Sequence, residues 1–317
     1  MSELKSRVML AMLNVSVWSA RAFDARATAE VQEHHNPRDD IGRFNKRLLP
    51  AKAPSFEAVY EVARRAREAF YRRTLRYGQD GVRLLPASAY MELAAEIRGF
   101  KSRFPAAVDA FLVDLPSLKA RQRDILNGLF VEGDYPSHDE LRKRFGFRFK
   151  VLPFPDAEQF GVELPQDALA QIRVDVEEHA AEVAETAMRD LWERLYEVVE
   201  RMAQRLLQPK PVIRDSLVGN VKELVEILPS LNFAGDAKLS DLCNQVCAKL
   251  ANQSPEDLRS NYSARAEAAR QAADIQAQMA EYMGIDMPEA FGLPETEQIG
   301  PSGDFPRSAQ RDAALLL

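Results

Sequence analysis

Cysteine, histidine and glycine are scarce in this chain, with 2, 4 and 14 occurrences in 317 residues. Cys243 and Cys247 stand four residues apart in a helical pattern, which suits neither a disulfide nor, without a nearby histidine, a zinc site. We expect both to be buried, inert thiols. The glycine patterns that hold phosphates or dinucleotides are missing, as are Gly-x-Ser-x-Gly and His-Glu-x-x-His. The sequence therefore predicts a protein that is not an enzyme and that uses no cofactor.

Long apolar runs are also lacking. The longest one near the N-terminus, residues 8–18, is interrupted by Asn14 and Ser16 and is shorter than the roughly 20 residues that cross a bilayer. No small-residue cleavage site follows a basic leader, so we expect no membrane association and a cytoplasmic location. One acidic and histidine-rich segment has the residue types of a metal site: Glu30, Glu33, His34, His35, Asp39 and Asp40. Adjacent histidines and the Asn36-Pro37 turn argue against shared ligation, so no metal is predicted.

Charge is divided by position. Residues 1–150 carry 27 Lys and Arg against 19 Asp and Glu, whereas residues 151–317 carry 15 against 29. A basic half is thus followed by an acidic half, although the net charge is only −6. Such asymmetry indicates a polyanionic or oppositely charged partner without identifying it.

The basic half concentrates its arginines in one helical segment after Ser55 and in a cluster before a basic strand. Together they form the predicted contact set for a partner or nucleic acid: Arg64, Arg65, Arg72, Arg73, Arg76, Arg142, Lys143, Arg144, Arg148 and Lys150. Guanidinium groups at this density suit phosphate or carboxylate ligands. Glu57, Glu61 and Glu68 lie in the same helix, however, and can pair with these arginines. Nucleic-acid binding, an acidic protein partner and an ordinary solvated face all remain open.

Periodicity predicts a mainly α fold, a long-helix bundle with a small two-stranded β element at about residues 9–18 and 145–152. Phe145, Phe147 and Phe149 recur at every second residue, with Arg148 and Lys150 on the opposite face, which is strand periodicity. The strand needs a partner such as the N-terminal one. Trp18 is expected in the core. Further helices are expected at about 20–33, from residue 55, at 87–100, 105–130, 137–144, 216–227 and 238–251, and from Ser254 to near Gly284, with residues 42–54 as a loop. We predict three regions: a basic α+β domain (1–160), an acidic long-helix domain (161–284) and a disordered tail (285–317).

The longest predicted helix runs from Pro165 to about Gln208. Its apolar stripe recurs at a mean spacing close to 3.7 residues, as in a straight or slightly right-handed helix. We expect this stripe to support self-association into a possible homo-oligomer or coiled coil, through Leu191, Leu195, Val198 and Met202.

Two segments carry a family resemblance, residues 14–21 (NVSVWSAR) and 42–50 (GRFNKRLLP), together with the aromatic basic strand. The chain resembles an uncharacterised bacteriophage and integrative-element family known only as a domain of unknown function. Members are often encoded near a MoxR-like AAA+ ATPase and a von Willebrand factor A protein. The resemblance implies an accessory role beside such a motor, with the ATPase or the von Willebrand factor A protein as partner, in the host cytoplasm if the chain is phage-encoded.

These observations favour a non-enzymatic phage or mobile-element scaffold or adaptor that acts through protein–protein interaction. The alternative is a nucleic-acid-binding accessory factor in phage DNA processing, whose binding would weaken steeply with salt.

Overall fold

The computed structural model describes residues 2–35, 42–78, 81–155, 165–208 and 211–284, and the prediction of a disordered tail at 285–317 lies outside them. In the first half the elements are α1 (Ser2–Arg7), β1 (Val8–Ser16), β2 (Arg21–Phe23), α2 (Ala25–His35), β3 (Asn45–Arg47), α3 (Pro54–Arg72), β4 (Leu75–Arg76), β5 (Arg83–Pro86), α4 (Ala87–Leu126), α5 (His138–Lys143) and β6 (Gly146–Pro153). The second half contributes α6 (Gln166–Leu206), α7 (Asp215–Leu231), α8 (Ala237–Val246), the π-helical turn η4 (Cys247–Ala251), α9 (Pro255–Ser260) and α10 (Tyr262–Met283). The fold is mainly α, as predicted.

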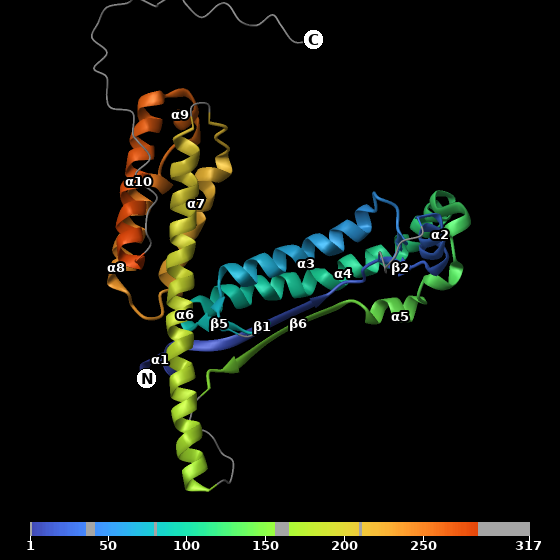
Figure 1. Ribbon diagram of the computed structural model, residues 1–317, viewed down its shortest axis with the longest axis horizontal. Coiled ribbons are helices and arrows are strands. Elements are labelled where there is room, and N and C mark those ends of the chain that lie inside the picture. The colour runs from blue at the N-terminus through green and yellow to red at the C-terminus, as the bar shows by residue number, and fades with distance from the viewer. Residues whose placement is uncertain (1, 36–41, 79–80, 156–164, 209–210, 285–317) are drawn as a thin grey trace, which may run out of the picture.

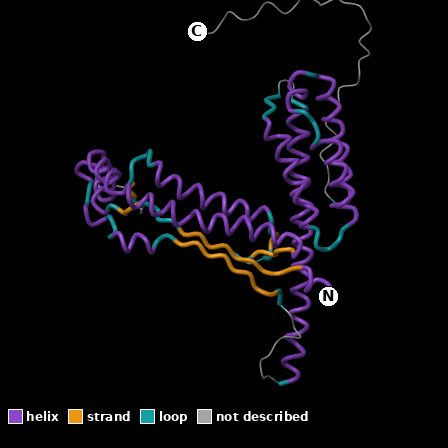
Figure 2. Tube along the Cα trace, turned by 180° about the vertical axis from the view of Figure 1, so that it is seen from behind, coloured by secondary structure: helices purple, strands orange, loops and turns teal. Residues whose placement is uncertain are grey.

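The molecule is built as an arm and an upright bundle (Figure 1). Helices α3 and α4 run side by side along the arm, with β1 and β6 beneath them. Helix α6 stands across the base of the arm, and α7–α10 pack beside its C-terminal half. Figure 2 shows the same division from behind. We call residues 8–155 the arm and α6–α10 the bundle.

The predicted strand pair is present within a larger sheet. Strands β1 and β6 are antiparallel, with Met9 opposite Pro153 and Ser16 opposite Gly146. Strands β4 and β5 extend the sheet in the order β4-β5-β1-β6, and β2 pairs with β3 in a separate sheet. The added strands are two to four residues long, too short to show an alternating pattern of their own.

Two local predictions near the N-terminus were wrong. The helix expected from residue 20 begins only at Ala25, because Arg21–Phe23 pairs with Asn45–Arg47 in the segment predicted as loop. Asp24 separates strand from helix: its Oδ1 accepts a hydrogen bond from the Ala27 backbone N–H at 2.9 Å. This carboxylate satisfies one of the free N–H groups that begin a helix.

Helix α4 is continuous for 40 residues, although two helices were expected, separated near Pro105. Both Pro105 and Pro116 lie inside it. Its buried face continues past each proline, with Phe104, Phe111 and Leu118 at most 3% exposed. The packing of this face offsets the backbone hydrogen bonds that the prolines cannot make.

Two of the remaining helix predictions were close, and a third was wrong at one point. Helix α5 has the predicted capping box, in which Ser137 and Glu140 bond each other's backbone N–H groups. Helix α6 matches the predicted 165–208 within two residues. The helix expected from Ser254 to near Gly284 is instead split in two, because the side chain of Asn261 caps a new helix by accepting from the N–H groups of Ser263 and Ala264.

The described residues form two hydrophobic cores. The arm core, which contains Trp18, Leu48, Phe104, Phe111 and Leu141, lies between α3, α4 and the outer part of the sheet. The larger hub core joins the inner ends of β1, β4 and β5 to the bundle helices. Strands β1, β4 and β5 and the helices of the bundle thus share one core, although the predicted domain boundary at residue 160 lies between them in the sequence. Trp18 is 3% exposed, and Phe147 and Phe149 are half-buried against the cores.

Candidate interaction surface on the basic arm

The arginines in the middle of α3 are paired within their own helix. Arg64 contacts Glu61 and Glu68, and Arg65 contacts Glu61 at 2.6 Å. Hydrogen bonds from Arg64 and Arg65 lower the pKa of the Glu61 carboxyl to about 2. These charges are neutralised one helical turn away, as the glutamates in the sequence allow.

The arginines at the end of α3 and in β4 meet acidic residues from elsewhere in the fold. Arg72 pairs with Glu223 of α7, and Arg73 pairs with Glu96 of α4 at 2.8 Å. Arg76 lies 3.4 Å from Glu193 of α6. Part of the basic half therefore faces the acidic half inside one molecule. Arg65 and Arg76 are nevertheless 60% exposed, so a role for them in binding a partner stays a prediction.

Four members of the predicted contact set make no ion pair among the described residues, although two of them, Lys143 and Arg144, help to lower the pKa of the nearby Glu140 carboxyl after its hydrogen bonds with Ser137. Arg142 is paired with Asp109 at 2.7 Å. The four unpaired members lie just after it along the chain, and all are exposed: Lys143, Arg144, Arg148 and Lys150. Within the predicted contact set, the structure thus leaves the end of α5 and strand β6 as the candidate cationic surface.

Strand β6 presents two different faces. Phe147 and Phe149 point to the helices, with their rings 5.6 Å from Phe104 of α4 and 6.3 Å from Phe70 of α3. Arg148 and Lys150 are exposed on the opposite face. There Arg148 lies across from Asn14, and Lys150 across from Met12. We call these four residues the open face of the sheet.

No described helix covers the open face along the arm, as both views show (Figures 1 and 2). Strand β6 is also the last strand of its sheet, so its outer edge has no described strand beside it. Backbone N–H and C=O groups along such an edge are available to another strand. The arm therefore combines an uncovered basic face with an open strand edge.

The stripe predicted for self-association lies inside the molecule. Leu191, Leu195 and Met202 are 0% exposed, and Val198 is half-buried against the same hub core. Helix α10 packs along α6 at this face. These side chains are buried within a single chain, so a second copy cannot contact them. The prediction that the chain self-associates through them is therefore corrected.

Other residues considered from the sequence have ordinary surroundings. The rings of His34 and His35 contact each other at 4.9 Å, and no cluster of three or more potential metal ligands occurs in the described parts of the chain. Cys243 is buried, and this burial raises the pKa of its thiol to about 11, whereas Cys247 is exposed, contrary to expectation. No described helix is both long and apolar enough to span a membrane.

Sequence reasoning missed a buried charged cluster at the tip of the arm. Lys46 is 3% exposed, and its Nζ contacts Asp24 at 2.7 Å and Asp134 at 2.8 Å. The Lys46 ammonium also donates a hydrogen bond to the backbone carbonyl of Leu129, at 2.8 Å. The carboxylate partners of Lys46 are remote from it in sequence, so no local pattern could reveal them. Comparisons with protein-family models, curated proteins and solved structures found no match.

Proposed function

We propose that this protein is a non-enzymatic adaptor that binds an acidic protein partner on the open face and outer edge of β6. The observation that carries the proposal is the pair Arg148 and Lys150, exposed on an uncovered sheet face and unpaired within the described residues. Nearby cations of the basic half are neutralised by carboxylates of the same chain. Cations that have no internal role are the ones available to a partner.

The edge of β6 supports an extended partner segment. A strand that adds to a sheet edge gains main-chain hydrogen bonds, and its side chains alternate between the two faces. Acidic side chains of that segment would lie beside Arg148 and Lys150 on the open face. Lys143 and Arg144 continue the positive charge beyond the start of the strand.

The shape of the molecule supports an adaptor role. The open face lies along the arm, and α7–α10 stand apart from it at the base (Figure 1). A partner on the arm leaves the bundle accessible to a second protein. From the family resemblance we propose a MoxR-like AAA+ ATPase or a von Willebrand factor A protein as the partner, in a phage or mobile-element setting.

Nucleic-acid binding is the less favoured alternative. Its support is the same set of four unpaired cations, all on or beside one strand. The arginines of α3 that would extend a phosphate-binding track are occupied by Glu61, Glu68 and Glu223. Because each phosphate contact adds to affinity, a track of a few cations binds a duplex weakly.

Charge reversal tests the proposal. The protein is used as bait in cells that express the candidate partners, and captured proteins are quantified by mass spectrometry. We expect Arg148→Glu with Lys150→Glu to reduce capture of the specific partner at least about tenfold, the scale of a few charge-assisted contacts. The matched control is Arg98→Glu with Lys101→Glu, which reverses two exposed cations on α4.

Capture that is unchanged by reversal on β6, or equally reduced by the control, contradicts the proposal. A parallel measurement uses fluorescence anisotropy with single-stranded and duplex DNA at two salt concentrations. Tight, strongly salt-dependent DNA binding that is lost with the β6 reversal would favour the nucleic-acid alternative.

A further inference from the structure

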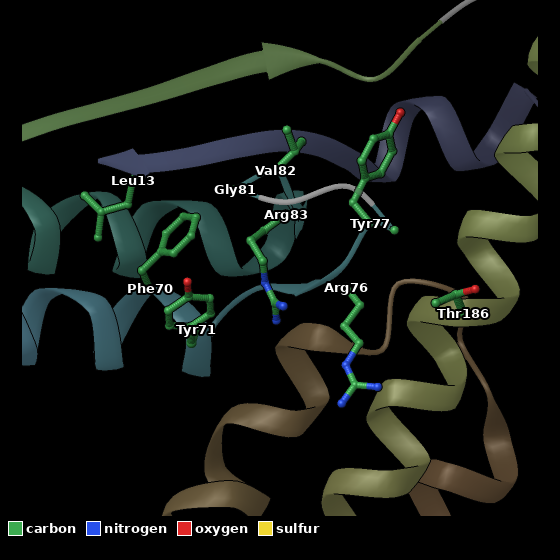
Figure 3. Close-up of a pocket in the computed structure, with 10 residues that line it drawn as sticks. Leu13, Phe70, Tyr71, Arg76, Tyr77, Gly81, Val82, Arg83 and Thr186 are labelled. Carbon is green, nitrogen blue, oxygen red and sulfur yellow. The ribbon is translucent and has the colours of Figure 1, made fainter. Parts of the chain in front are cut away.

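A cavity of about 340 Å³ lies where β4 and β5 approach α6 (Figure 3). Its wall includes Phe70 and Tyr71 from α3, Arg76 from β4, Arg83 from β5 and Thr186 from α6. Figure 3 shows the side chains of Arg76 and Arg83 extending in the same direction, with the Tyr71 ring beside Arg83. The cavity is distinct from the open face of the sheet.

Two like charges face each other in this wall. Arg76 and Arg83 are directly opposite on antiparallel strands, an arrangement that is destabilising unless a negative charge compensates for it. Asp190 of α6, 5% exposed, supplies part of that charge. Its carboxylate lies 2.8 Å from Arg194, 3.5 Å from Arg76 and 3.9 Å from Arg83. With Glu193 near Arg76, three guanidinium groups face two carboxylates, which leaves one positive charge in excess.

Arg83 is the least compensated of the three. Its side chain is only 16% exposed, whereas that of Arg76 is 60% exposed, and its distance to Asp190 is the longest of the set. It donates hydrogen bonds to the hydroxyl and carbonyl of Thr74, which are neutral acceptors. Burial, followed by the nearby Arg194, lowers the pKa of the Arg83 guanidinium from its usual value. A buried cation with such partners is stabilised by an added anion.

We propose that this cavity binds a small ligand with a phosphate-ester or carboxylate group carried on a flat apolar ring. The anionic group bonds the paired guanidinium groups of Arg76 and Arg83, whose planar donors match two oxygens at once. Arg83 lies over one face of the Tyr71 ring at 5.2 Å, and Tyr71 is 52% exposed, so the part of its ring that Arg83 does not cover can contact the apolar part of the ligand. The volume falls within the range of about 300–1,000 Å³ that is typical of small-molecule sites.

Titration calorimetry with phenyl phosphate and with benzoate, at constant ionic strength, tests this site. We expect saturable binding of at least one probe to the wild-type protein. Arg83→Gln and Arg76→Gln should each weaken that binding at least about tenfold, because each removes one charge-assisted donor set. Circular dichroism establishes that each variant is folded.

Two further variants test whether binding depends on the charge of the cavity itself. Thr186→Glu places a carboxylate on the exposed α6 side of the cavity, where it should satisfy the arginines internally and abolish binding without unfolding the chain. Arg201→Gln is the control, since Arg201 is 62% exposed on the same helix and, among the described residues, pairs only with Glu197, at 3.9 Å. If Arg83→Gln fails to fold, Arg76→Gln and Thr186→Glu decide. Absence of saturable binding to the wild type, or binding unchanged in these variants, overturns the proposal.

Discussion

The replacement Phe111→Ala tests whether the arm core stands by itself. Phe111 is 0% exposed, and its ring lies 4.8 Å from Phe56, 5.8 Å from Phe145 and 6.3 Å from Trp18. Removing a fully buried phenyl ring costs about 3–5 kcal/mol of unfolding free energy. Because the arm core is smaller than the hub core, we expect this loss to unfold the outer arm while the bundle stays folded.

The two tryptophans of the chain report the two cores separately. Trp18 belongs to the arm core and Trp192 to the hub core. Trp192→Phe therefore leaves an arm reporter, and Trp18→Phe leaves a hub reporter. Urea unfolding is followed by fluorescence in each background with and without Phe111→Ala. We expect the midpoint to fall strongly for the Trp18 reporter and to change little for the Trp192 reporter.

A matched change in the other core gives the reverse result. Leu195 is 0% exposed in the hub core, and Leu195→Ala costs about 2–5 kcal/mol. It should shift the Trp192 transition more than the Trp18 transition. If both reporters move together by the same amount in both variants, the two cores unfold as one unit and the reasoning is refuted.

Three further predictions concern single groups. The pKa of Asp24 is lowered from its usual 3.8, first by the Ala27 backbone N–H and then by Lys46, so its stabilisation is full above that pH and declines as the pH falls further. Asp24→Asn should flatten the acid side of the stability curve measured by thermal melts, and an unchanged slope contradicts this. With a thiol reagent at pH 8, the exposed Cys247 should react rapidly and the buried Cys243 slowly. The prediction is wrong if both thiols of the native protein react rapidly, or if rapid reaction persists in Cys247→Ser. Pro105→Ala should raise the free energy of unfolding, measured in urea, by up to about 3 kcal/mol. Alanine restores a backbone N–H inside α4, and position 105 is exposed, so no packing is lost. A lower free energy of unfolding would indicate that the helix requires the proline.

Elements defined by their own periodicity were predictable from the sequence. Alternating phenylalanines placed β6, and the long apolar stripe placed α6 within two residues. The capping box at Ser137 was visible because both of its members are three residues apart. In each case either the stabilising contact is local, or the buried face repeats with the period of a strand or a helix.

Elements that depend on distant partners were not predictable. Strand β3 exists because Lys46 pairs with Ala22 in register, and its buried ammonium contacts Asp24 and Asp134. Pro105 indicated a break that the packed face of α4 overrides. The Arg76–Arg83 pair arises from a two-residue strand against a four-residue strand, where no sequence pattern gives the register. In these cases tertiary packing outweighs local propensity.

The division of charge along the sequence has two separate origins in the fold. Arg72 pairs with Glu223 over 151 residues, and Arg76 approaches Glu193 over 117, so part of the asymmetry joins the arm to the bundle. Another part, on β6, meets no described carboxylate. Net charge by region counts both parts alike, because it ignores which charges are already paired. The cations that line the open face, rather than the net charge of the whole basic half, should therefore dominate how strongly salt weakens the binding of an acidic partner there.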